Sequence, residues 1–246
     1  MAPHAGIDAD RASRDFVSAL RSPRAHVLLW SVAVVLVALD LWSKSWAFSR
    51  LPPEGAVGVI PGVLEFRRSL NDGAVFGSFT GYVNIFIIAS VLAIGFVTYL
   101  FAQSGSRHWF LHACLGMIVS GALGNLYDRA FVQADVLRFT SGPSQGRSVI
   151  GVLVEGGGED ELRLDHWPPS GDIRTIRRDD VTVRQQGVVR DFLKFTPVFP
   201  TWVPRVGGQD VWPWVFNVAD AALVSGVIGL LLHSMVDHRR MKRREA

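Results

Sequence analysis

Three carboxylates in or at the ends of strongly apolar segments are the first candidates for chemistry in this chain: Asp40, Asp128 and Asp220. A charge at membrane depth costs roughly 3 kcal/mol on insertion scales, so such residues usually have a function. Two of them share a local pattern, Asn125-Leu-Tyr-Asp128 and Asn217-Val-Ala-Asp220. Residues three apart share a helix face, so each amide can support its carboxylate or a bound peptide backbone. A single Asn-x-x-Asp pair is typical of a helix cap. Two such pairs that meet at one face of the membrane favour a functional site.

Two nearby carboxylates are the chemical core of aspartic proteolysis, because like charges a few Å apart hold one proton between them. The ionised carboxylate takes a proton from water, which attacks the scissile carbonyl, and the protonated one assists the carbonyl oxygen and the leaving amine. The sequence offers no obvious alternative: Cys114 is the single cysteine, and His112 has no metal partner at ligand spacing. We therefore expect no metal and no cofactor.

The composition indicates that membrane-spanning helices position these carboxylates. The 246 residues are 49% hydrophobic and 19% charged, with a mean hydropathy of +0.25, whereas soluble domains are about a quarter charged. A spanning helix needs about 20 mostly apolar residues. We expect tails at 1–26 and 237–246, transmembrane helices at 27–48, 82–102, 110–128 and 215–236, a short loop at 103–109 and long loops at 49–81 and 129–214.

The charge pattern predicts the orientation of the four spans. Basic residues crowd both ends of the chain; next to a span they indicate a cytoplasmic end more often than nucleic-acid binding. Both termini and the loop at 103–109 are then cytoplasmic, and the long loops face outward. We consequently expect all three carboxylates to lie at the outer face of the membrane. The helix rise places Asp128 and Asp220 at similar depths.

The loops contain patterns typical of strands. Ser148–Val154 and Glu161–Asp165 flank three glycines and predict a β-hairpin, and Val181–Arg184 and Val57–Phe66 predict further strands. The predicted fold is therefore a mainly α membrane protein of four transmembrane helices with a small extracytoplasmic β-rich element. Rows of small residues four apart, such as Gly116, Ser120 and Gly124, allow close helix packing.

Four blocks of residues, in order along the chain, resemble the bacterial lipoprotein signal peptidases, or signal peptidase II. The resemblance implies a monomeric aspartic endopeptidase of the bacterial inner membrane that contacts membrane lipids and not nucleic acid. Its substrates would be prolipoproteins, cut before a diacylglyceryl-modified cysteine. The blocks are Asp40-Leu-Trp-Ser-Lys44, Asn71-Asp-Gly-Ala-Val-Phe-Gly77, Gly121-Ala-Leu-Gly-Asn-Leu-Tyr-Asp-Arg129 and Val215-Phe-Asn-Val-Ala-Asp220.

The same resemblance assigns roles to residues within these blocks. It makes Asp128 and Asp220 the catalytic pair. Asp40 and Lys44 are four residues apart on one helix face, a good geometry for a buried ion pair. Arg129 binds backbone carbonyls or lipid phosphate on one interpretation and only snorkels to the headgroups on the other. The supporting positions are Asp40, Lys44, Asn71, Asn125, Arg129 and Asn217.

The chain also departs from the family pattern. Ser43, Ser120 and Ala221 replace common family residues without touching a proposed proton-transfer group. The segment Gly187-Val-Val-Arg-Asp-Phe192 resembles a family segment but carries an extra residue and comes much later. An insertion at about 134–186 precedes it and has no explanation in the resemblance, which leaves the role of Asp191 open.

Two other functional classes remain to be compared. A transporter or proton pathway also uses intramembrane carboxylates, but a relay needs acids staggered in depth. A non-enzymatic scaffold suits the inserted loop, but it has no use for paired Asn-x-x-Asp blocks. The predicted clustering of the three carboxylates at one face and the two Asn-x-x-Asp blocks therefore both favour the peptidase.

Overall fold

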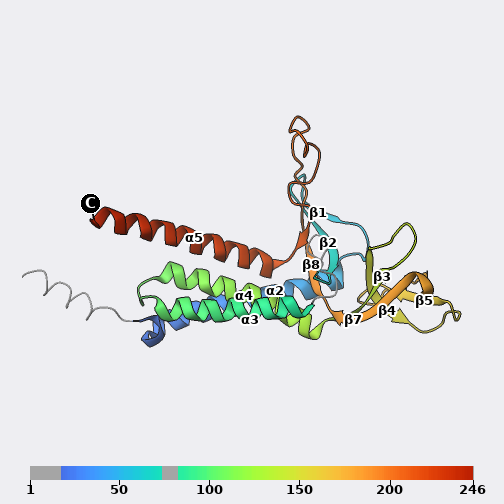
Figure 1. Ribbon diagram of the computed structural model, residues 1–246, viewed down its shortest axis with the longest axis horizontal. Coiled ribbons are helices and arrows are strands. Elements are labelled where there is room, and N and C mark those ends of the chain that lie inside the picture. The colour runs from blue at the N-terminus through green and yellow to red at the C-terminus, as the bar shows by residue number, and fades with distance from the viewer. Residues whose placement is uncertain (1–17, 74–82, 246) are drawn as a thin grey trace, which may run out of the picture. The chain divides into compact units, whose positions relative to one another are not determined.

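The computed structural model describes residues 18–73 and 83–245. The N-terminal tail and residues 74–82, which hold the end of the second family-like block and the start of the second predicted span, lie outside the described residues. The chain divides into two compact units (Figure 1). The helical unit comprises Met1–Leu39, Ala89–Leu123 and Val218–Ala246, and the strand-rich unit comprises Asp40–Ile88 and Gly124–Asn217.

Four long helices occupy the regions where apolar runs predict them: α2 (Pro23–Arg50), α3 (Val83–Gln103), α4 (Trp109–Phe131) and α5 (Val218–Glu245). Three described segments are long and apolar enough to cross a membrane, Pro23–Arg50, Trp109–Phe131 and Val218–Arg239, while the apolar part of α3, Ile87–Gln103, is shorter. The predicted start of the fourth helix at residue 215 is wrong. Val215–Phe216 form strand β9 instead, and α5 begins at Val218.

Helix α4 is more deeply buried than α2 or α5. In an apolar 18-residue stretch of α4, 61% of the residues are buried, against 22% in the corresponding stretches of α2 and α5. A Cβ on Gly116 would lie 2.6 Å from the Leu29 carbonyl oxygen of α2, and one on Gly121 would lie 2.5 Å from the Ala219 carbonyl oxygen of α5. Glycine therefore permits backbone contact on both sides of α4, as small residues do between membrane helices.

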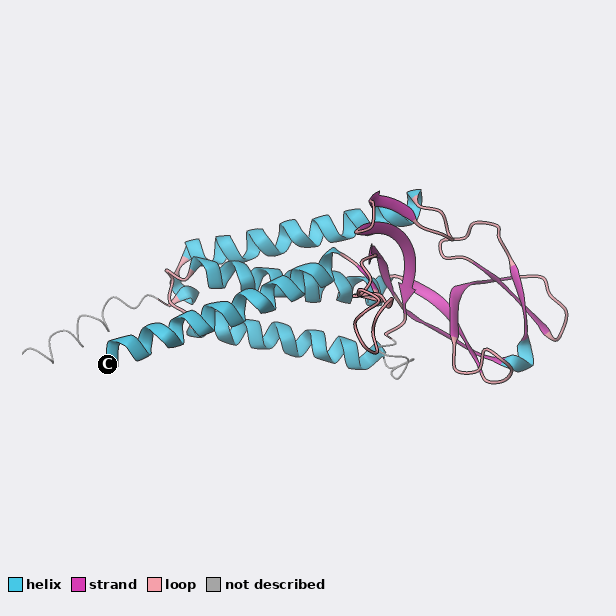
Figure 2. Ribbon diagram, turned by 90° about the horizontal axis from the view of Figure 1, so that it is seen from above, coloured by secondary structure: helices cyan, strands magenta, loops and turns pink. Residues whose placement is uncertain are grey.

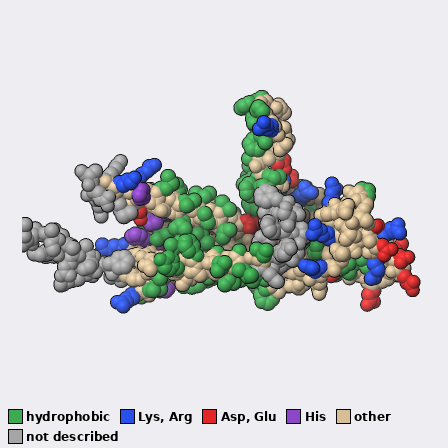
Figure 3. All heavy atoms as spheres, viewed as in Figure 1, with side chains coloured by type: hydrophobic (Ala, Val, Ile, Leu, Met, Phe, Trp, Pro, Cys, Tyr) green, Lys and Arg blue, Asp and Glu red, His purple; other side chains and the backbone are tan. Residues whose placement is uncertain are grey.

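Large apolar side chains cover the outside of the helices, where Figure 3 shows them in green. A soluble protein rarely exposes a continuous apolar surface of this kind. A lipid environment makes such exposure favourable, because no water meets the side chains. The exposed residues include Val27, Trp30, Val34 and Val35 on α2, Val91, Leu92 and Phe96 on α3, and Val224, Ile228, Leu231 and Leu232 on α5.

A four-stranded antiparallel sheet in the strand-rich unit has the order β1-β2-β8-β9. Its other strands are β1 (Val57–Ile60), β2 (Leu64–Asn71) and β8 (Val189–Phe195). The prediction of one strand over Val57–Phe66 is wrong, because the chain turns between Ile60 and Leu64. Gly62 adopts a φ of 70° there, and the Val63 N–H donates to the Ile60 carbonyl oxygen at 3.0 Å.

The insertion forms the second sheet, five strands in the order β6-β5-β4-β3-β7 (Figure 2). Strands β4 (Ser148–Val154) and β5 (Glu161–Asp165) pair antiparallel, as the glycine-rich turn predicts. Strand β7 (Val181–Gly187) returns to pair with β3 (Gln133–Phe139), with Gln133 opposite Gly187. The insertion therefore begins and ends at neighbouring positions of the strand-rich unit. The remaining strand is β6 (Arg174–Arg177), and two short 3-10 helices, η1 and η2, cover Ala19–Arg21 and Arg178–Asp180.

Asp165 ends β5 and organises the turn that follows. Its carboxylate accepts hydrogen bonds from the backbone N–H groups of Gly171, Ser170 and His166. These bonds, that from Gly171 foremost, lower the pKa of Asp165 below its ordinary value of 3.8. The insertion also contacts the β1–β2 part of the same unit, since Arg68 donates to the Trp167 carbonyl oxygen at 2.7 Å.

Candidate active site

Asp40 and Lys44 form the ion pair that their spacing on α2 predicts. The Lys44 Nζ lies 2.7 Å from Asp40 Oδ2, and both side chains are fully buried. Lys44 also donates to Asn125 Oδ1 at 3.1 Å and lies 3.4 Å from Asp128 Oδ2. A buried lysine needs such partners, because an unpaired charge away from water is very costly. Lys44 therefore joins α2 to the motif at the end of α4.

Asp128 is fully buried and bound by two cations. The Arg190 Nη2 donates to Asp128 Oδ1 at 2.7 Å, and the Arg190 Nε donates to the same oxygen at 3.2 Å. The backbone N–H of Arg190 donates to Asp128 Oδ2 at 2.9 Å. Asp40, Lys44, Asp128 and Arg190 thus form a buried cluster of two acids and two bases, whose formal charges cancel. We call it the ionic cluster.

The approach of β8 to the end of α4 depends on a glycine. A Cβ on Gly187 would collide with the Arg129 carbonyl oxygen, so no other residue fits this position without a shift. The Val188 N–H then donates to the Val132 carbonyl oxygen at 3.0 Å. These contacts bring Arg190, two residues further on, to Asp128.

Asp191 has different partners from its neighbour Arg190. Only 2% of its surface is exposed. Its Oδ1 accepts a hydrogen bond from Asn217 Nδ2 at 2.6 Å, and its Oδ2 accepts one from Asn71 Nδ2 at 3.2 Å. Two cations bind Asp128, and two side-chain amides donate to Asp191.

Strand pairing explains how these residues meet. Strand β8 lies between β2 and β9, with Ser69 opposite Asp191 and Leu193 opposite Phe216. Asn71 ends β2, and Asn217 follows β9 directly. Both amides therefore reach the central strand from its two sides.

Asn217 also links Asp191 to the ionic cluster. Its Nδ2 lies 3.1 Å from Asn125 Oδ1, the same oxygen that accepts from Lys44. The structure therefore brings six of the eight predicted site residues into one hydrogen-bonded network. They are Asp40, Lys44, Asn71, Asn125, Asp128 and Asn217.

The two remaining predicted residues are Asp220 and Arg129. Asp220 is in the first turn of α5, belongs to the helical unit and is partly exposed. Arg129 donates from Nη1 to the Asn125 carbonyl oxygen at 3.4 Å. The predicted pairing of Asp128 with Asp220, and the role of Arg129, stay predictions.

Sequence reasoning missed Arg190 and left Asp191 without a role. Arg190 is the extra residue in the Gly187–Phe192 segment, and it is the residue that binds Asp128. The sequence did contain a signal for both residues. Arg190 and Asp191 are adjacent charged residues inside an otherwise apolar strand segment, and buried charges need partners.

A family model described as Signal peptidase (SPase) II matches residues 32–236 of the chain. The lipoprotein signal peptidase of Desulfitobacterium hafniense is 25% identical over 219 residues, which cover 89% of this chain and 100% of that protein. The lipoprotein signal peptidase of Xanthomonas campestris is 25% identical over 226 residues, covering 90% and 96%. The lipoprotein signal peptidase of Deinococcus radiodurans is 38% identical over 105 residues, covering 41% and 54%.

A solved structure has a similar fold. It is described as a bacterial membrane enzyme and superimposes with a TM-score of 0.52, covering 84% of this chain and 87% of its own. The two sequences are 19% identical, so this likeness speaks for the fold alone.

Proposed function

This chain belongs to the signal peptidase II family, and from that premise we propose that it is an aspartic endopeptidase that removes signal peptides from lipid-modified prolipoproteins. The observation that carries the proposal is the buried network of carboxylates and amides. It unites residues from all four family-like blocks and from the Gly187–Phe192 segment. Cleavage takes place before the diacylglyceryl-modified cysteine.

Asp220 is one of the two catalytic carboxylates in this proposal, and the sequence prediction pairs it with Asp128. The contacts favour a different partner. A carboxylate whose two oxygens are both held by a guanidinium, a backbone N–H and an ammonium has few positions left for water or a peptide carbonyl. Asp128 has these three partners, so the ionic cluster suits anchoring rather than proton transfer.

Asp191 suits proton transfer better. The side-chain amides of Asn71 and Asn217 orient its two oxygens, and the side chain is almost fully buried. It also lies one hydrogen bond from Asn217, which precedes Asp220 by three residues. We therefore assign the catalytic pair as Asp191 and Asp220, with Asp128 as the competing assignment that mutation tests.

The reaction then needs only water and the two carboxylates. The ionised carboxylate removes a proton from water, whose oxygen forms a bond to the scissile carbonyl carbon. The protonated carboxylic acid donates a hydrogen bond to the carbonyl oxygen, which becomes negatively charged. Collapse of the tetrahedral intermediate breaks the C–N bond, and the amine takes a proton as it leaves. One free carboxyl end and one new amino terminus result.

The proposed membrane arrangement has four spans, α2 to α5, with both termini cytoplasmic. The exposed apolar side chains of these helices support it. The strand-rich unit and the ends of α2 and α4 that carry Asp40 and Asp128 then face the extracytoplasmic side of the inner membrane. A site at this surface lets the diacylglyceryl group of the substrate remain in lipid during cleavage, and a monomer is sufficient for it.

Two matched precursors test this function. Each carries the same signal peptide and cysteine, but only one carries the diacylglyceryl group. The purified protein in detergent should shorten the lipidated precursor, and mass spectrometry should place the cut directly before the modified cysteine. Equal rates on both precursors would contradict the lipid requirement, and absence of any cleavage of the lipidated one would contradict the function.

A further inference from the structure

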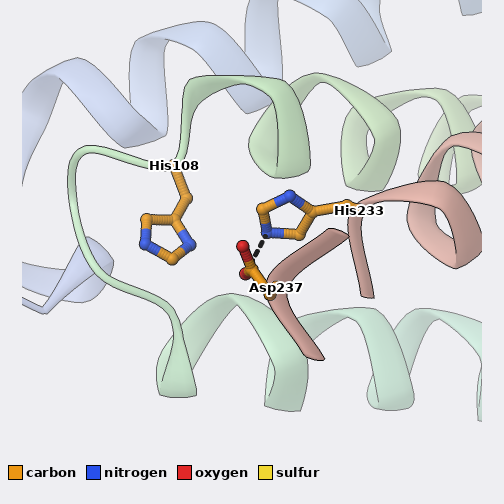
Figure 4. A group of neighbouring side chains, drawn as sticks. All are labelled: His108, His233 and Asp237. Carbon is orange, nitrogen blue, oxygen red and sulfur yellow. Dashed lines mark ion pairs between the residues drawn. The ribbon is translucent and has the colours of Figure 1, made fainter. Parts of the chain in front are cut away.

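A second group of polar side chains lies in the helical unit, outside the proposed active site. His108 precedes α4 in the α3–α4 connection, and His233 and Asp237 lie one turn apart on α5. Figure 4 shows the three side chains directed toward one another, with His108 and His233 flanking the Asp237 carboxylate. Residues far apart in the sequence supply this group, so no local pattern in the sequence predicts it.

The distances suit ligands of one metal ion. His233 Nε2 lies 3.2 Å from Asp237 Oδ2. One ligand atom from each of the three residues can be chosen so that all lie within 4.8 Å of one another. Two ligands bound at about 2.0–2.1 Å around a tetrahedral ion lie roughly 3.4 Å apart. The His233–Asp237 pair already has about this separation, and one nitrogen of His108 lies within 4.8 Å of a ligand atom of each of the other two residues.

A cavity beside the group gives it access to ions and water. The cavity has a volume of about 490 Å³, and Trp109, Phe110 and Leu232 line it together with the three polar residues. Three protein ligands leave one position of a tetrahedral ion free. Water in the cavity can fill that position.

We propose that His108, His233 and Asp237 bind a first-row transition metal ion of the Zn²⁺ type. Imidazole nitrogen suits such ions, and the carboxylate supplies negative charge. Arg107 lines the same cavity and opposes a cation. The carboxylate between the two imidazoles nevertheless favours a cation over a phosphate, which would meet the negative charge of Asp237 at the centre of the group.

The bound ion would tie the far end of α5 to the connection that precedes α4. Both elements belong to the helical unit, so the metal would brace this unit without taking part in peptide cleavage. The inference therefore does not depend on the proposed function.

His108 distinguishes a metal site from a simpler interpretation. His233 and Asp237 are four residues apart on one helix, where an ion pair between neighbouring side chains explains their contact without any metal. That interpretation leaves His108 with only an edge-to-face ring contact to His233, at 5.4 Å between the ring centroids. A metal site requires His108 as a ligand.

Cobalt(II) provides a direct test, because a tetrahedral Co²⁺ complex with nitrogen and oxygen ligands absorbs visible light. The full chain, purified in detergent without a histidine tag, is treated with chelator and titrated with Co²⁺. We expect one Co²⁺ per chain with visible absorption, which Zn²⁺ displaces. H108A and H233A should each weaken binding about tenfold or more, and D237N should weaken it less.

H166A is the matched control. His166 belongs to the other group of potential ligands, with Glu54 and Asp172. It should leave Co²⁺ binding unchanged, and thermal unfolding of each metal-free variant shows whether the protein is folded. Wild-type protein without visible Co²⁺ absorption would overturn the proposal, and so would undiminished binding by folded H108A.

Discussion

Asp128→Asn tests whether the ionic cluster stabilises the fold. The substitution keeps the size of the side chain and removes its negative charge. Lys44 and Arg190 then remain buried with Asp40 as their only carboxylate within the cluster. Breaking a buried ion pair by removing one partner costs about 3–5 kcal/mol. For a chain of this length, that loss corresponds to a fall in Tm of roughly 6–20 °C.

A second substitution separates charge from shape. D128N/R190Q removes one acid and one base, so the charges of the remaining Asp40–Lys44 pair cancel again. We expect the double variant to regain part of the lost stability, with a coupling energy of about 0.5–3 kcal/mol between the two positions. R190Q alone should also lower the Tm, because it leaves Asp128 with Lys44 alone among the cations of the cluster.

The assay is thermal unfolding of the purified variants in one detergent, with cleavage of the lipidated precursor measured well below each Tm. Asp160→Asn is a suitable control, since Asp160 is exposed in the insertion and its change should stay within about 0.5 kcal/mol. A wild-type Tm for D128N would refute the argument that the ionic cluster holds the ends of α2, α4 and β8 together. Additive effects in D128N/R190Q would refute the pairing.

Three further predictions follow from the packing and the insertion. Replacing residues 134–186 by a short Gly/Ser linker should preserve cleavage, because Gln133 and Gly187 are paired neighbours; a folded but inactive variant would contradict this. Asp165→Asn should speed hydrogen exchange at Gly171 above pH 3.8, and the difference from wild type should vanish as the pH falls, since a lowered pKa contributes stability only while the carboxylate is ionised; a difference that persists in acid would show another cause. Gly121→Leu should destabilise the helical unit by about 1–3 kcal/mol, because the Ala219 carbonyl oxygen occupies the space of a Cβ; an unchanged Tm would contradict this packing.

Local patterns in the sequence predicted much of this structure. The spacing of Asp40 and Lys44 gave their ion pair, since residues four apart meet on a helix. Apolar length placed the four helices, and the glycines at 156–158 marked the turn between β4 and β5. The family prediction is confirmed by the match over residues 32–236.

Contacts between distant segments could not be predicted in the same way. Asp191 meets Asn71 and Asn217 only because β8 pairs with both β2 and β9, and strand register across such separations has no local signal. The ion pair between Arg190 and Asp128 depends on the close approach at Gly187. The late start of α5 also has a non-local cause, because Val215 and Phe216 pair with β8.

The central claim is that two carboxylates, Asp191 and Asp220, cleave the lipidated precursor. Its most direct test is the single-turnover cleavage rate of D191N, D220N and D191N/D220N, each corrected for the folded fraction. We predict a loss of about 10²-fold or more in each single variant, with the double variant scarcely slower because the pair acts as a unit. Near-normal cleavage by folded D191N or D220N would contradict the account, and normal D191N beside folded but inactive D128N would return the catalytic role to Asp128.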